Sequence, residues 1–176
     1  LTLGDIDLLV VEVEDDAGVV GTGHLHPLAG GMRTLDTCVH EMLKPLLIGE
    51  SPEDVPALWD KMWQATFIQG RMGITVMAMS ALDVALWDLA GRRAGKPLWA
   101  LWGGTDDPIP VYGSGCFRGL GHDGMIAKAE QFVAQGFKAI KMQVAHVFTH
   151  DEDVVNVRDM RTALGDEIEI MVDVNQ

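Results

Sequence analysis

Polar side chains interrupt two short apolar segments of the sequence, "GFKAIKMQV" at 136–144 and "EIMVDVNQ" at 169–176. Lys141 and Gln143 lie in the first segment, and Asp173 and Asn175 lie in the second. Burying an unpaired charge costs several kcal/mol, so a lysine within an apolar strand needs a partner or a function. Amines, amides and carboxylates bind acidic substrates, transfer protons or coordinate metal ions. A fold that brings these four side chains together would therefore form a chemical site.

Both segments have the composition of short β-strands. Because side chains alternate between the two faces of a strand, Lys141 and Gln143 share one face, and Asp173 and Asn175 share one face of the later strand. Helical patterns at 122–135 and 151–164 separate these segments and an earlier strand at 109–114. This alternation predicts βαβ units and a parallel sheet. In a parallel barrel, the aliphatic faces would pack on outer helices and the four polar side chains would converge at the mouth, where active sites lie.

The first part of the chain has a different organisation. A hairpin is predicted at 8–23, with Gly18 at positive φ in the turn "DDAG". Helices are predicted at 36–46, at 52–66 with Ser51 as N-cap, and at 72–94, where Gly95 and the following proline end the pattern. We therefore expect an α+β domain at 1–106 and an α/β domain at 107–176.

Composition limits the classes of partner. The chain of 176 residues has a formal net charge of -13 and a pI near 4.6, so we expect neither a nucleic-acid nor a membrane partner. The longest apolar region is interrupted by Asp83 and Asp88, which we interpret as structural residues that cap or pair with Arg92 or Arg93. Two distant cysteines without metal-site spacing favour a reducing cytoplasm, in which we expect a soluble protein. The first residue is Leu1 and the last residues lie within an apolar run, so we expect both ends to be cut from a longer protein.

Three segments, in this order and at these separations, carry a family resemblance. The segments "SALDVALWDLAGRRAGKPLWALWGG", "GFKAIKMQV" and "IMVDVNQ" resemble the enolase superfamily, in its mandelate racemase and muconate lactonizing enzyme branch, which includes sugar-acid dehydratases. The resemblance implies an α+β capping domain followed by the start of a (β/α)8 TIM-type barrel, truncated after about the third barrel strand. It also implies a Mg²⁺ cofactor, removal of the proton α to a substrate carboxylate, and a homo-oligomer.

The resemblance implies a role for each polar residue of the two strands. Asp173 matches the first metal-binding carboxylate, and Asn175 matches its polar companion in the substrate site. Lys141 matches the first lysine of a K-x-K pair and would lie by the substrate carboxylate. The second lysine, usually a base, falls at Gln143, where this sequence departs from the family pattern. Since an amide is no base and racemisation needs a base on each face, the departure favours dehydration of a sugar acid over racemisation.

The same residues permit other interpretations. Lys141 could be a structural lysine paired with Asp173, and a racemase, an epimerase or a cycloisomerase of the same superfamily is an alternative activity. A non-catalytic fragment or degenerate paralogue is a further alternative, because Gln143 replaces the lysine base and only about three of eight barrel strands are present. His24 and His26 have same-face spacing, and they and Arg71 lie where the resemblance places mobile loops that contact substrate. Two histidines without a third ligand are, however, more often surface residues.

Overall fold

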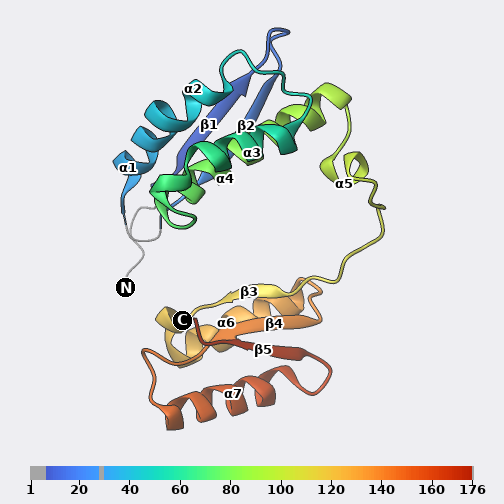
Figure 1. Ribbon diagram of the computed structural model, residues 1–176. Coiled ribbons are helices and arrows are strands. Elements are labelled where there is room, and N and C mark those ends of the chain that lie inside the picture. The colour runs from blue at the N-terminus through green and yellow to red at the C-terminus, as the bar shows by residue number, and fades with distance from the viewer. Residues whose placement is uncertain (1–6, 28–29, 176) are drawn as a thin grey trace. The chain divides into compact units, whose positions relative to one another are not determined.

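The computed structural model describes residues 7–27 and 30–175, which form two compact units that divide between Asp107 and Pro108 (Figure 1). The first contains β1, β2 and α1 to α5, and the second contains β3, β4, β5, α6 and α7.

The first unit begins with an antiparallel hairpin of β1 (Leu9–Glu14) and β2 (Val20–Leu25). The side chain of Asp15 closes the turn, since its Oδ1 accepts hydrogen bonds from the backbone N–H groups of Ala17 and Val19, each at 2.9 Å. These bonds, led by that from Val19, hold the pKa of Asp15 below its usual value. Gly18 has φ of 77°, so the predicted hairpin and its left-handed glycine are confirmed.

Helices cover this hairpin. They are α1 (Met32–Thr37), a π-helical segment (Cys38–Leu43), α2 (Lys44–Leu47), α3 (Val55–Ala65), a short 3₁₀ turn (Phe67–Gln69), α4 (Ile74–Ala94) and α5 (Leu98–Leu101). The predicted start of the second helix, with Ser51 as its N-cap, is wrong. The helix begins at Val55 because the Asp54 side chain accepts the N–H of Ala57, and a proline occupies its first turn.

Helix α4 packs directly on β2 (Figure 1). Only glycine permits this approach: a Cβ on Gly21 would lie 2.2 Å from the carbonyl oxygen of Ala85, and one on Gly23 would lie 2.0 Å from that of Ala81. The backbone N–H of Thr22 donates to Asp88 of α4 at 2.8 Å. The hairpin and α4 therefore form the centre of the first unit.

The charged residues of α4 have structural partners. Asp88 pairs with Arg92 at 2.8 Å, and Arg93 pairs with Asp15 at 2.9 Å, so the structural interpretation of Asp88 is confirmed. Asp83 is half-buried, and burial raises its pKa, but it forms no ion pair within residues 7–27 and 30–175. The helix ends where predicted, at Gly95 with φ of 60°.

Helix α4 is long and apolar enough, by length and composition, to cross a membrane. Half of its apolar window is buried inside the structure, and core helices of globular domains pass the same test. Several of its buried residues, among them Met79, Leu82 and Leu86, belong to the hydrophobic core of the first unit.

The second unit contains a parallel sheet in the order β3-β4-β5, formed by β3 (Gly113–Cys116), β4 (Ala139–Gln143) and β5 (Glu169–Asp173). The connections are α6 (Gly121–Ala134), preceded by a 3₁₀ turn (Arg118–Leu120), and α7 (His150–Leu164), as Figure 1 shows. The predicted strand–helix alternation is confirmed. The first strand begins later than predicted, since Ile109, Val111 and Tyr112 precede it as exposed residues.

Side chains on the aliphatic face of β4 form the core of this unit. Ile140 and Met142 are fully buried in one cluster with Met125 and Ala129 of α6 and Met160 of α7. This confirms that the aliphatic face packs on helices. Beyond Ile170 the corresponding face of β5 is open, with Val172 at 53% and Val174 at 54% exposure. The opposite face of the sheet carries Lys141, Gln143 and Asp173.

We predict that Gly23→Ala lowers the free energy of unfolding by about 2 kcal/mol or more, because the added methyl overlaps the α4 backbone. Chemical denaturation measures the change. Gly119→Ala is the matched control, since a Cβ there meets no atom within 4 Å. Equal stability of the two variants would contradict the close packing of β2 on α4.

Candidate active site

The parallel register of β4 and β5 places the predicted site residues together. Gln143 lies opposite Asp173, and Lys141 lies opposite Met171 two residue pairs earlier. The Nζ atom of Lys141 lies 3.2 Å from Oδ2 of Asp173, and both side chains are about one-third exposed, at 28% and 33%. The ammonium also lies 5.3 Å from the ring centroid of Tyr112. A cation and a carboxylate therefore share the carboxyl-terminal edge of the sheet.

Neighbouring groups stabilise the charged forms of both residues. The pKa of Lys141 is raised by Asp173 first and by Tyr112 second. The pKa of Asp173 is lowered first by the backbone N–H of Asn175, which donates to Oδ1 at 3.0 Å, and then by Lys141. Asp173 is therefore a carboxylate and Lys141 an ammonium at neutral pH. This ion pair fits the structural interpretation of Lys141, in which the lysine pairs with Asp173. It fits a substrate-site role as well, because the same two charged groups would lie side by side in such a site.

Gln143 is held by a residue that sequence reasoning missed. Its Oε1 accepts a long hydrogen bond, 3.4 Å, from the backbone N–H of Arg118. The Nη1 atom of Arg118 donates to the carbonyl oxygens of Val144 at 2.9 Å and Ala145 at 3.3 Å. The only signal in the sequence was a basic residue in the glycine-rich segment after the first barrel strand.

The backbone is strained at the ends of β4 and β5. Ala145, His146 and Asn175 are non-glycine residues with positive φ, of 65°, 61° and 51°. The N–H of Ala145 donates to Asp153 of α7 at 2.9 Å, and Nε2 of His146 lies 3.0 Å from the carbonyl oxygen of Val174 and 2.8 Å from that of Asn175. Strained backbone of this kind clusters at functional sites, where surrounding contacts maintain it.

The three remaining predicted residues belong to the other unit. His24 is exposed on β2 opposite Val10, and His26 is exposed just beyond the strand. Arg71 donates to the carbonyl oxygen of Trp63, and its guanidinium lies 4.0 Å from the centroid of the Trp63 ring. These contacts stabilise the loop before α4. A substrate role for His24, His26 and Arg71 stays a prediction.

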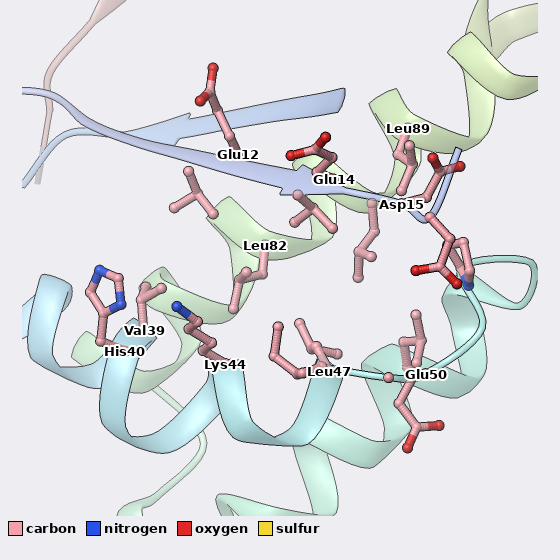
Figure 2. A pocket seen from close by; sticks show the side chains of 18 of the residues that line it. Glu12, Glu14, Asp15, Val39, His40, Lys44, Leu47, Glu50, Leu82 and Leu89 are labelled. Carbon is pink, nitrogen blue, oxygen red and sulfur yellow. The ribbon is translucent and has the colours of Figure 1, made fainter. Parts of the chain in front are cut away.

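The first unit also contains a cavity of about 570 Å³ along β1. Figure 2 shows Lys44 and Glu50 on its helical side and Glu12 and Glu14 on the strand. None of the predicted site residues lines this cavity. The predicted residues Lys141, Gln143 and Asp173 lie together at the ends of β4 and β5, which we therefore regard as the candidate active site.

The described residues provide individual side chains that could bind a metal ion. No cluster of three or more His, Cys, Asp or Glu suited to a metal ion occurs within residues 7–27 and 30–175. Asp173 is a carboxylate at a strand end, about one-third exposed, with the Asn175 amide two residues later. Oxygen donors of these types suit a hard cation such as Mg²⁺, which a protein often binds through one or two carboxylates.

Two family models match the chain. One describes the mandelate racemase / muconate lactonizing enzyme N-terminal domain and matches residues 1–103, and the other describes an enolase C-terminal domain-like region and matches residues 124–176. The chain belongs to the mandelate racemase / muconate lactonizing enzyme family. Within this enolase-superfamily branch, the observed α+β unit is the capping domain, and the parallel βα unit is the start of the barrel.

Curated relatives in this family act on sugar acids. The chain is 39% identical to 3,6-anhydro-alpha-L-galactonate cycloisomerase of Streptomyces coelicolor, over 97% of this chain and 47% of the relative. It is 34% identical to arabinonate dehydratase of Saccharolobus solfataricus, over 97% and 46% of the two chains. The chain thus spans about half the length of the curated relatives it matches.

Solved structures of the family have the same fold. A racemase from Streptomyces coelicolor with bound magnesium superposes with a TM-score of 0.90 at 39% identity, over 97% of this chain and 51% of that chain. An L-talarate dehydratase from Polaromonas, complexed with Mg and L-glucarate, superposes with a TM-score of 0.86 at 33% identity, over 100% of this chain and 49% of that chain. These comparisons confirm the predicted family and fold class.

We predict that Ala145→Gly raises the free energy of unfolding by about 0.5–1 kcal/mol, because glycine adopts positive φ without steric cost. The matched control is Ala127→Gly in the exposed interior of α6, which should lower it by a similar amount. Denaturant titration measures both. If the two substitutions destabilised the protein equally, the left-handed conformation of Ala145 would be wrong.

Proposed function

We propose that the whole protein is a Mg²⁺-dependent enzyme that removes the proton α to a substrate carboxylate and dehydrates a sugar acid. One observation carries the proposal: the β4–β5 register, in a member of this family, sets Lys141 3.2 Å from Asp173 at the carboxyl-terminal edge of the barrel sheet. Relatives named as dehydratases of arabinonate and of L-talarate and galactarate support the substrate class.

The proposal gives each strand-end residue a role. Asp173 would hold the metal ion, and its low pKa keeps it ionised for that purpose. When bound, Mg²⁺ stabilises the negative charge that develops on the substrate carboxylate as the α-proton leaves. Lys141 would donate to that carboxylate, since its raised pKa keeps it charged. Asn175 adds polar contacts beside Asp173.

The described residues supply only part of such a metal site. Mg²⁺ takes octahedral oxygen coordination, and Asp173 and Asn175 provide at most two protein ligands. We assign the remaining carboxylate ligands and the proton-abstracting base to the part of the relatives' length that this chain does not span. Gln143, an uncharged amide, cannot be that base.

Cycloisomerisation is the second candidate activity, because the cycloisomerase of Streptomyces coelicolor is 39% identical to this chain. Both reactions begin with loss of the proton α to a carboxylate. They differ in mass balance, since dehydration releases water and cycloisomerisation leaves the mass unchanged. Mass spectrometry of the product distinguishes them.

The test uses the full-length protein with arabinonate, galactarate and 3,6-anhydro-L-galactonate in D₂O, with and without Mg²⁺. We expect Mg²⁺-dependent exchange or loss of the α-proton for at least one acid, with loss of water. No reaction with any of the acids would favour the degenerate paralogue, and turnover without any metal dependence would contradict the proposed role of Mg²⁺. Exchange of the α-proton of both enantiomers or epimers would favour a racemase or epimerase.

Substitutions in the two strands test the assigned roles. We predict that Lys141→Met lowers kcat/KM at least about 100-fold, and that Asp173→Asn weakens Mg²⁺ binding by a similar factor, because each removes a charge that the reaction needs. Steady-state kinetics and metal titration measure the effects. Lys138→Met is the matched control, since Lys138 is exposed three residues earlier. If the Lys141 and Lys138 variants were equally active, the substrate role of Lys141 would be wrong and the structural interpretation would hold.

A further inference from the structure

The orientation of the Gln143 amide follows from its partner. Oε1 of Gln143 lies 3.4 Å from the backbone nitrogen of Arg118. A backbone N–H can only donate, so the amide atom that faces it must be the oxygen. The carbonyl end of the Gln143 side chain is therefore occupied within the protein, and the NH₂ group is the end that remains.

Arg118 is itself fixed in place by the strand that carries Gln143. Its Nη1 donates to the carbonyl oxygens of Val144 and Ala145, the two residues that follow Gln143. The guanidinium thus attaches the segment after β3 to the end of β4, and this contact sets the position of the Arg118 backbone N–H. Charge-assisted hydrogen bonds to two carbonyl groups hold such a contact strongly.

The NH₂ group of Gln143 has no hydrogen-bond partner in the part of the chain that the structure describes. The side chain is half-buried and lies on the same sheet face as Lys141 and Asp173. The free donor therefore belongs to the same strand-end cluster as the ammonium. An acid bound there would meet a positive charge from Lys141 and neutral N–H donors from Gln143.

We infer that Gln143 donates its amide N–H to an acceptor oxygen of the bound hydroxy acid, and that Arg118 is the positioning residue that turns the amide in this direction. The inference rests on the proposed function. Position 143 then supplies a hydrogen bond for binding and no base for proton transfer. Arg118 acts through Gln143 and touches no substrate.

The test compares Gln143→Met, Arg118→Met and the double variant of the full-length protein. L-Lyxarohydroxamate, which occupies an L-talarate/galactarate dehydratase structure with Mg, is the binding probe in calorimetric titrations with Mg²⁺. We expect each single variant to weaken probe binding about 10-fold or more, as loss of a hydrogen bond to a charged oxygen would. The double variant should be no weaker than Gln143→Met, because both changes remove one contact.

Two further readouts separate positioning from general damage. The thermal midpoint and the Mg²⁺ affinity of Gln143→Met should equal those of the wild type, and KM of both single variants should rise more than kcat falls for any acid that the wild type converts. Arg158→Met is the matched control, since Arg158 is exposed on α7. Arg118→Lys, which keeps a cation for the same carbonyl groups, should recover part of the affinity.

Three results would overturn the inference: unchanged probe binding by Gln143→Met, single effects that multiply in the double variant, or no probe binding by the wild type. The proposed function fails on a different result, the absence of Mg²⁺-dependent α-proton loss. Binding that depends on Gln143 and Arg118, without α-proton loss, would sustain the inference and refute the proposed function.

Discussion

The hydrogen-bonded register between β4 and β5 is the constraint on which the candidate site depends. Because Gln143 lies opposite Asp173, side chains that are 30 or more residues apart in the sequence share one edge of the sheet. A shift of either strand by one residue would turn its polar side chains towards the helices. The buried residues Ile140 and Met142 oppose such a shift, since their packing on α6 and α7 fixes which face of β4 is covered.

The ends of these strands combine strain with dense hydrogen bonding. Ala145, His146 and Asn175 adopt left-handed conformations, and the contacts of Ala145 with Asp153 and of His146 with two carbonyl groups maintain them. Asp173 and Gln143 also accept backbone N–H groups at this edge, from Asn175 and Arg118. The proposed binding of an acid beside a metal ion would benefit from such contacts, because less ordering is needed when the ligand arrives.

The capping unit depends on a separate contact, the approach of α4 to β2. Gly21 and Gly23 leave room for the helix backbone, and Asp88 accepts the N–H of Thr22 between them. Asp15 and Arg93 connect the turn of the hairpin to the end of the same helix. These interactions make the hairpin a stable support for the loops that contain His26 and Arg71, for which a substrate role is predicted.

The sequence by itself determined the strand–helix alternation, the face of each strand that carries Lys141, Gln143 and Asp173, and the family, because these depend on periodicity and on local motifs. Tertiary structure decided the rest. The start of α3 depends on which side chain, that of Ser51 or that of Asp54, accepts a free N–H, and the length of β3 depends on pairing with β4. The contact of Arg118 with Gln143 joins residues 25 positions apart, and the left-handed φ of Ala145 is an exception to alanine's local preference. Such contacts have no signature in the composition of either segment, since they exist only after the sheet has formed.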